Sequence, residues 1–125
     1  MTSTILLIDD EDLVVRSIQK LLTKEGYAVL VARSGEEAIA IVQNQEVDLI
    51  VCDVRMPKMN GVETLRQIRN LLHSGSRRQP REILITGYAE DNINQEAEGL
   101  QVADYIYKPF DLRDFVICIR KNLQR

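Results

Sequence analysis

Five short runs rich in Ile, Leu and Val alternate along the chain with segments whose apolar residues recur every three or four positions. The runs predicted to be strands are Thr4–Asp9, Tyr27–Arg33, Val47–Asp53, Glu82–Thr86 and Asp104–Lys108. Four of them are almost continuously apolar, which is typical of strands covered on both faces. Strict alternation of strand and helix over five units predicts an α/β fold with a parallel sheet between two layers of helices.

The helical segments have recognisable beginnings and ends. The first ends at Gly26, the second opens at the capping box Ser34–Glu37, the third opens at Asn60, the fourth spans about Asp91–Gly99, and the last begins at Asp111. No linker or low-complexity stretch interrupts the pattern. The 125 residues fit one domain, so we expect a single domain over residues 1–125 that ends with the last helix and has no output domain attached.

Composition narrows the classes of protein. A net charge of −3 argues against direct nucleic-acid binding, which needs clustered Lys and Arg. No apolar run approaches the roughly 18–20 residues that cross a bilayer, and no secretory signal is visible, so a cytoplasmic protein is expected. The basic cluster Arg77, Arg78 and Arg81 is predicted to be a solvated loop. Cys52 and Cys118 match no metal-ligand spacing and are predicted to be small buried residues.

Chemically active side chains stand where four of the strands end. Asp9 is the last residue of the first predicted strand, and Asp10 follows it. The third strand ends at Asp53, the fourth at Thr86 and the fifth at Lys108. The carboxyl ends of parallel strands meet at one edge of a sheet, which is where such folds bind ligands. Taken singly, each of these residues is better explained by a solvated loop, but their joint appearance favours a site.

Such a cluster suggests both a cofactor and a reaction. Neighbouring carboxylates repel one another unless a cation joins them, and oxygen ligands of this kind suit Mg²⁺. A carboxylate such as Asp53 can attack phosphorus to form an acyl phosphate, while a metal and Lys108 stabilise the charge on the transferring group. The hydroxyl of Thr86 could then donate to the product, and Gly87 beside it would leave the approach open.

Four strings of residues resemble the receiver domains of two-component response regulators, in order and over essentially the whole chain. They are Ile8-Asp9-Asp10-Glu11, Asp53-Val54-Arg55-Met56-Pro57-Lys58-Met59-Asn60-Gly61, Thr86-Gly87-Tyr88-Ala89 and Tyr105-Ile106-Tyr107-Lys108-Pro109-Phe110. The resemblance implies a flavodoxin-like (βα)5 fold with strand order 2-1-3-4-5. It also implies phosphorylation by a sensor histidine kinase or phosphotransfer protein, and control of a downstream effector or output domain.

The resemblance implies a role for each residue of the acidic group. Asp53 would be the phosphoacceptor that becomes 4-aspartylphosphate. Asp10, Asp53 and the backbone carbonyl of Arg55 would bind Mg²⁺ directly, with Asp9 acting mainly through water. Lys108 would pair with the phosphoryl group. The protein would be a signalling phosphoacceptor rather than an enzyme with turnover.

The remaining implied roles concern the switch. Thr86 and Tyr105 would be the switch pair, and the bond from Lys108 to Pro109 would be cis. Partners would contact the fourth helix, fifth strand and fifth helix, and a phosphorylation-dependent dimer is compatible with that surface. Arg55 and Tyr88 would flank the path of the water that cleaves the acyl phosphate, which predicts a long-lived phosphorylated state if they cover it. The alternative, that both side chains point to solvent and leave this path open, is equally compatible with the sequence.

Two rival interpretations remain. A hydrolase of the haloacid-dehalogenase type also uses an Asp nucleophile and Mg²⁺, but it generally places a second Asp two residues later, where this chain has Arg55. An adaptor that uses the fold without phosphorylation would be expected to lack members of the acidic set, and every member is present. A nucleotide-binding interpretation fails because no Gly-rich loop follows the first strand.

Overall fold

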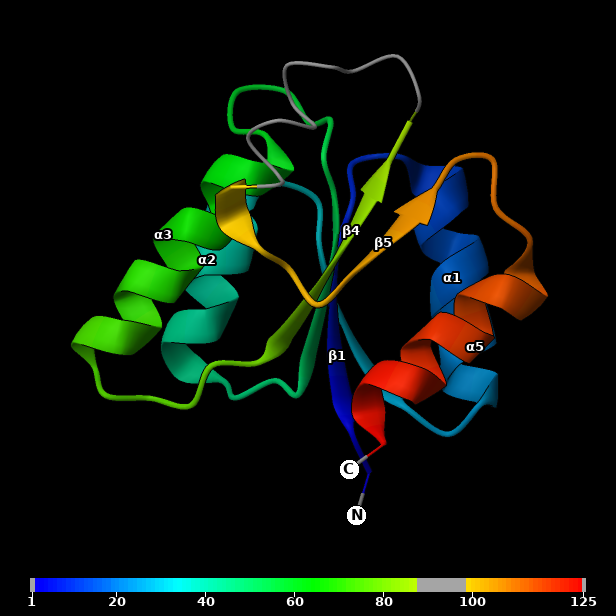
Figure 1. The fold of residues 1–125 in the computed structure, drawn as a ribbon, viewed down its shortest axis with the longest axis horizontal. Coiled ribbons are helices and arrows are strands. Elements are labelled where there is room, and N and C mark those ends of the chain that lie inside the picture. The colour runs from blue at the N-terminus through cyan, green and yellow to red at the C-terminus, as the bar shows by residue number, and fades with distance from the viewer. Residues whose placement is uncertain (1, 88–98, 125) are drawn as a thin grey trace.

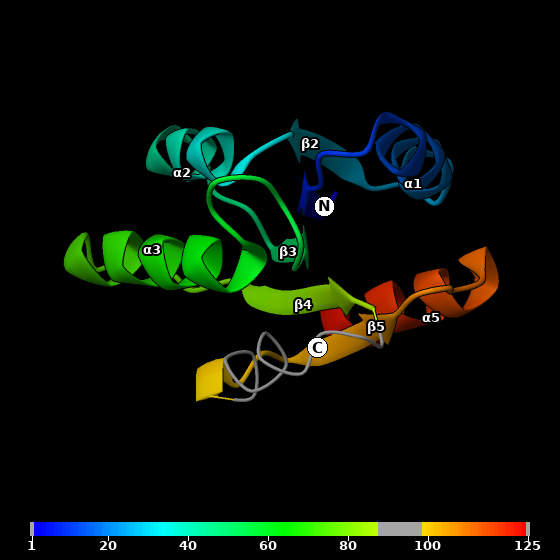
Figure 2. The same ribbon diagram turned by 90° about the horizontal axis from the view of Figure 1, so that it is seen from above.

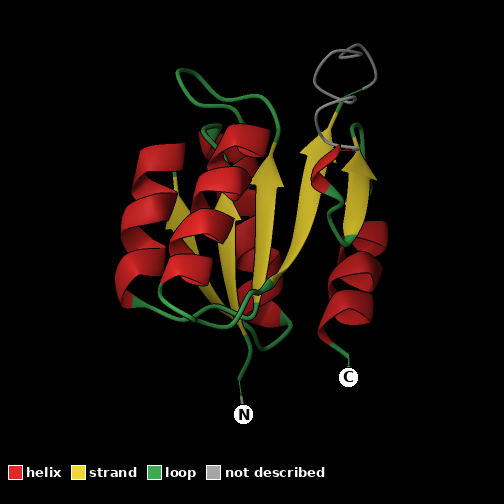
Figure 3. Ribbon diagram, turned by 60° about the vertical axis from the view of Figure 1, so that its left-hand side comes forward, coloured by secondary structure: helices red, strands yellow, loops and turns green. Residues whose placement is uncertain are grey.

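The computed structural model describes residues 2–87 and 99–124, and its centre is a five-stranded parallel sheet. The strands are β1 (Thr4–Ile8), β2 (Ala28–Ala32), β3 (Leu49–Asp53), β4 (Arg81–Thr86) and β5 (Asp104–Tyr107), as Figures 1 and 3 show. Their order in the sheet is β2-β1-β3-β4-β5. The flavodoxin-like arrangement predicted from the sequence is therefore confirmed.

The described helices form two layers. They are α1 (Asp12–Lys24), α2 (Gly35–Asn44), α3 (Gly61–Ser74) and α5 (Leu112–Leu123). Helices α2 and α3 cover one face of the sheet and α1 and α5 the other, which Figure 2 shows from above. The helix predicted over Asp91–Gly99 lies almost wholly outside the described residues.

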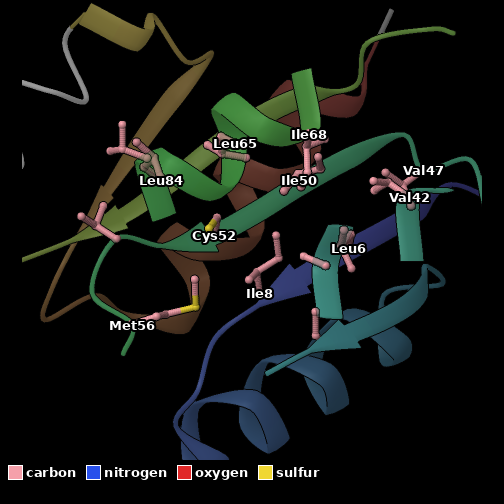
Figure 4. Packing of buried hydrophobic residues seen from close by; sticks show 14 of the residues in the cluster. Leu6, Ile8, Val42, Val47, Ile50, Cys52, Met56, Leu65, Ile68 and Leu84 are labelled. Carbon is pink, nitrogen blue, oxygen red and sulfur yellow. The ribbon is translucent and has the colours of Figure 1, made fainter. Parts of the chain in front are cut away.

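Both faces of the sheet are packed, which explains why the strands are apolar without alternation. Side chains alternate in direction along a strand, so Leu6 and Ile8 pack under α2 and α3, while Ile5 and Leu7 pack under α1 and α5. Figure 4 shows the first of these cores. Each fully buried aliphatic side chain contributes roughly 1.5–3 kcal/mol of transfer free energy, so the two cores hold the strand ends rigidly in register.

Three of the helices begin with the side-chain caps that their sequences suggest. Ser34 Oγ accepts the amide of Glu37 at 3.1 Å, and Asn60 Oδ1 accepts the amide of Glu63 at 2.9 Å. Asp111 Oδ1 accepts the amide of Asp114 at 3.0 Å. These caps fix where the chain turns from each loop at the carboxyl edge of the sheet into the following helix.

The basic loop before β4 lies at the surface, but two of its arginines are structural, contrary to the expectation of a merely solvated loop. Arg77 donates to the carbonyls of Val42, Gln43 and Gln45 at the end of α2. These carbonyls lack intrahelical partners, so a guanidinium satisfies them well. Arg78 pairs with Asp48 at 2.8 Å.

The two cysteines differ in their burial. Cys52 is buried as predicted, whereas Cys118 is only half-buried because its part of α5 borders the surface. Of the helices in the described ranges, none combines the length and apolar character needed to cross a membrane.

Candidate functional site

The carboxyl edge of the sheet brings together the side chains that the sequence placed at the strand ends. In the β1–β3 ladder Ile8 is the partner of Cys52, so Asp9 and Asp53 follow on adjacent strands. On the other side of β3, the amide of Lys108 donates to the carbonyl of Thr86 at 2.8 Å, which ties the end of β5 to the end of β4. The predicted convergence of these residues is thus borne out by the strand register.

Three carboxylates form the acidic part of this site. One oxygen from each of Asp9, Asp10 and Asp53 lies within 4.8 Å of the other two. Asp10 is exposed, whereas Asp9 is fully buried and Asp53 is only 2% exposed. The backbone amide of Glu11 donates to Asp9 Oδ1 at 2.9 Å. The other oxygen, Asp9 Oδ2, is buried and has no hydrogen-bond partner among the described residues.

Burial and mutual repulsion make this cluster costly in the absence of a cation. Burial raises the pKa of Asp53 to about 6; the charge of Asp9 raises it as well, and Lys108 partly offsets both effects. Burial also raises the pKa of the Asp9 carboxyl. Three close carboxylates, an all-oxygen donor set and one buried oxygen without a partner fit a hard divalent cation such as Mg²⁺.

Lys108 provides the positive charge of the site. Its Nζ lies 3.3 Å from both carboxylate oxygens of Asp53 and 3.9 Å from Glu11 Oε1. The peptide bond between Lys108 and Pro109 is cis, as the resemblance implied. Beyond it, the ring of Phe110 packs on the buried Phe115 with centroids 5.3 Å apart, which anchors the loop to α5. The ammonium therefore stands on a loop fixed at both ends.

The two residues expected to act as a switch lie on neighbouring strands. Thr86 is 2% exposed, and its hydroxyl donates to the carbonyl of Gly87 at 3.3 Å. Tyr105 is half-buried, and its ring stacks on Tyr107 with centroids 6.2 Å apart and an angle of 19° between the planes. Tyr107, which the sequence did not single out, is 50% exposed.

Two side chains were expected to flank the site, and the structure describes one of them. Arg55 is exposed, and its backbone amide donates to the Asp53 carboxylate. The side chain expected to cover the site together with Arg55 belongs to Tyr88, which lies outside the described residues.

Sequence reasoning missed two close neighbours of the site. Glu11 lies close to Lys108, and its place directly after Asp9 and Asp10 in the sequence could have indicated that it borders the site. Gly61, interpreted only as a helix beginning, packs directly against the backbone of Asp53.

A sequence profile of the response regulator receiver domain matches residues 5–120, which is nearly the whole chain. The chain belongs to the response regulator receiver domain family. The transcriptional regulatory protein CpxR of Klebsiella pneumoniae is 37% identical over 121 residues, which cover 97% of this chain and 49% of CpxR. The regulatory protein AtoC of Escherichia coli is 34% identical over 96% of this chain and 25% of its own length. The chain thus spans about half or less of these two relatives.

Solved structures agree with this assignment. A CheY-like receiver domain protein from Methanospirillum hungatei superposes with a TM-score of 0.87 at 28% identity, covering 98% of this chain and 94% of that one. The chemotaxis protein CheY4 of Vibrio cholerae has a TM-score of 0.84 at 24% identity, with 98% of this chain and all of that one covered, which supports the shared fold.

Proposed function

We propose that this receiver domain accepts a phosphoryl group on Asp53 in a Mg²⁺-dependent reaction, and that the phosphorylated state is sensed by a downstream partner or output domain. The donor would be the phosphohistidine of a sensor kinase or of a phosphotransfer protein. The observation that carries the proposal is a buried carboxylate with a lysine ammonium 3.3 Å from both its oxygens and two further carboxylates beside it.

The donor set of the acidic cluster supports a metal at this position. Asp10 and Asp53 would bind Mg²⁺ through carboxylate oxygens, and the carbonyl of Arg55 would complete the protein ligands. Asp9, whose buried Oδ2 has no partner among the described residues, would hold one of the metal's waters. When bound, the ion would neutralise the acidic cluster and stabilise the charge on the oxygens of the transferring group.

The chemistry assigned to the chain begins with Asp53 in its ionised form. A carboxylate oxygen attacks phosphorus, the phosphorus–nitrogen bond of the donor breaks, and its electron pair stays on the imidazole nitrogen, which takes a proton from solvent. The product is an acyl phosphate. The ammonium of Lys108 already contacts both carboxylate oxygens of Asp53, and it would then pair with the negatively charged oxygens of the bound phosphoryl group.

The switch would transmit this event to β5 and α5. In the proposal the hydroxyl of Thr86 turns from the Gly87 carbonyl toward the phosphoryl oxygens, and the ring of Tyr105 turns inward behind it. In this structure Tyr105 stacks on Tyr107, and the rotation of Tyr105 would remove that ring contact from Tyr107. Phosphorylation would thereby alter an exposed aromatic side chain at the surface.

A groove at this surface suits a partner. Its volume is about 500 Å³ and it lies between β5 and α5. Its lining includes Tyr105, Tyr107, Ile117 and Cys118, together with the acidic Asp104, Asp111 and Asp114 and the basic Lys121. An apolar segment with basic residues matches this lining. We propose the same face for phosphorylation-dependent dimerisation, and a cytoplasmic location for the domain.

Incubation with acetyl phosphate and Mg²⁺ tests the function. We expect the wild-type protein to gain one phosphoryl group by intact-mass analysis and Asp53→Asn to gain none. A hydrolase would instead turn over p-nitrophenyl phosphate continuously, and a phosphorylation-independent adaptor would gain no phosphate at all. Either of those results would overturn the proposal.

A further inference from the structure

The first residue of α3 approaches the backbone of the proposed phosphoacceptor more closely than any side chain would allow. A Cβ atom built on Gly61 would lie 2.4 Å from the carbonyl oxygen of Asp53, 3.1 Å from its carbonyl carbon and 3.0 Å from Val54 Cα. All three are backbone atoms within or beside β3, so they cannot rotate aside as the end of a flexible side chain could. Only glycine fits this position without a shift of the backbone around Asp53.

The need for glycine here is spatial rather than conformational. Among the described glycines only Gly26 has a positive φ, so an alanine could adopt the backbone angles of Gly61. Alanine is also the better helix former by about 1 kcal/mol. Local helix preference therefore favours alanine at position 61, and the close approach to Asp53 opposes it.

Hydrogen bonds fix this approach from both sides. The amide of Gly61 donates to the carbonyl of Val54 at 2.8 Å, and the amide of Val54 donates to the carbonyl of Ile85 on β4 at 2.9 Å. The thiol of Cys52 contacts the Asp53 carbonyl at 3.4 Å. The peptide after Asp53 is therefore clamped between the beginning of α3 and strand β4.

We infer that Gly61 is a positioning residue for phosphoryl transfer, because it sets the place of the backbone segment from which the Asp53 carboxylate and the Arg55 carbonyl project. This inference rests on the proposed function. A shift of this segment to make room for a Cβ would move both groups relative to Lys108, which stands on a different loop. Misplacing a reacting group by about 1 Å can cost on the order of 10²-fold in rate, so a small displacement suffices.

The test compares two glycines that occupy the same position in two helices. Gly61 follows the N-cap Asn60 of α3, and Gly35 follows the N-cap Ser34 of α2. A Cβ on Gly35 would meet Thr64 Oγ1 at 2.4 Å and Met59 Sδ at 2.7 Å, which are side-chain atoms rather than the backbone of Asp53. Gly35→Ala is therefore a control that adds crowding against side chains and not against the backbone of Asp53.

The measurement is the rate of phosphorylation by acetyl phosphate at saturating Mg²⁺, with the Mg²⁺ dissociation constant determined alongside it. Both are taken at a temperature where each variant's unfolding curve shows it to be folded. We expect Gly61→Ala to react about tenfold or more slowly and to bind Mg²⁺ more weakly, with Gly35→Ala within about twofold of wild type. Equal rates in Gly61→Ala and wild type would overturn the inference. So would equal slowing of the two variants in step with their loss of stability.

A milder pair of variants decides the question if Gly61→Ala does not fold. Asn60→Ala removes the cap that holds the first turn of α3, and Ser34→Ala removes the equivalent cap of α2. Each loss costs about 1 kcal/mol of stability. We expect only Asn60→Ala to slow phosphorylation, and equal rates in the two would overturn the inference. Wild type and Asp53→Asn in the same assay separate the two ideas, because failure of wild type to take up phosphate defeats the proposed function itself.

Discussion

The ammonium of Lys108 lies 3.3 Å from both carboxylate oxygens of Asp53, a side chain that is almost completely buried. The two residues are 55 positions apart and are joined only because β5 and β3 end at the same edge of the sheet. A buried carboxylate with one cation beside it and two acids near it is poised between ionised and protonated forms. Most of the behaviour expected of this domain follows from that balance.

Loss of the Lys108 ammonium should slow phosphorylation far more than it affects the fold. Lys108→Ala removes the positive charge that favours ionised Asp53 and that, in the proposed function, would stabilise the transferring group. Removing one such stabilising contact typically costs about 10²–10³-fold in rate, and we expect a loss in that range with acetyl phosphate at pH 7. Lys121→Ala, which removes a largely exposed partner of Asp104, is the control and should react at the wild-type rate. A Lys108→Ala protein as reactive as the control would show that the contact has no part in transfer.

Asp53→Asn should stabilise the metal-free domain at neutral pH. The pKa of Asp53 is raised from 3.8 to about 6 in the folded state, so the folded state binds this proton more tightly than the unfolded state does. The stability from this group is present below pH 3.8 and is lost as pH rises through about 6. The amide side chain of the Asp53→Asn variant carries no charge, so the variant does not lose this stability as pH rises. We expect its free energy of unfolding to be about 1–3 kcal/mol higher than that of wild type at pH 7, with EDTA present to remove metal ions. Urea unfolding measures it, with Glu46→Gln as the exposed control. A less stable Asp53→Asn protein would contradict the raised pKa.

Magnesium should stabilise the wild-type domain in a pH-dependent manner. A ligand that binds only the folded state raises its stability by mass action, so Mg²⁺ should raise Tm at pH 7.5. Protons compete for Asp53 below about pH 6, where the gain in Tm should shrink. Asp10→Asn, which removes the exposed member of the cluster, should lose most of the gain at every pH. Thermal shifts with and without Mg²⁺ across pH 5–8 provide the measurement, and a gain that grows toward pH 5 would be incompatible with carboxylate ligands.

The acidic site could be predicted from the sequence because its members occupy equivalent places, namely the ends of parallel strands. Once the alternation of strand and helix fixes the sheet, Asp9, Asp53 and Lys108 must meet at one edge. The sequence could not show that Gly61 presses on the Asp53 carbonyl, because that distance depends on how α3 packs against β3 and β4. Nor did it show that Arg77 serves the end of α2, since the contact joins residues 35 positions apart across a surface loop.

A second non-local pair, Arg69 and Glu82, should contribute strongly to stability. Glu82 is buried, and Arg69 Nε lies 3.0 Å from both its carboxylate oxygens, while Nη1 donates to the Leu100 carbonyl at 2.6 Å. Arg69→Ala would leave a buried carboxylate without its countercharge. Because the arginine is about one-third exposed, we expect a cost of about 2–3 kcal/mol, below the usual range for fully buried pairs. Arg120→Ala, which breaks the more exposed pair with Glu25, should cost less than about 1 kcal/mol in the same urea experiment. Equal losses in the two variants would show that burial of Glu82 does not matter.

The switch should be visible in the tyrosine signal. The chain has four tyrosines and no tryptophan, so near-ultraviolet circular dichroism reports mainly on tyrosine environments. Beryllium fluoride with Mg²⁺, as a stable substitute for the phosphoryl group, should change this signal as the Tyr105–Tyr107 stack rearranges. Thr86→Ala should abolish the change while still binding the analogue, and Tyr27→Phe should retain it. If Thr86→Ala showed the full change in signal, the rearrangement of the tyrosines would not depend on the Thr86 hydroxyl.

Chemical trapping can show whether Asp53, rather than another acid of the cluster, receives the phosphoryl group. Sodium borohydride reduces an acyl phosphate of aspartate to homoserine, which marks the modified residue permanently. Trypsin would release Asp9 and Asp10 in the peptide of residues 1–16 and Asp53 in that of residues 34–55, so mass spectrometry can tell them apart. After treatment with acetyl phosphate and Mg²⁺, we predict homoserine at position 53 alone. Homoserine at position 9 or 10, or none in any peptide, would show that Asp53 is not the phosphoacceptor.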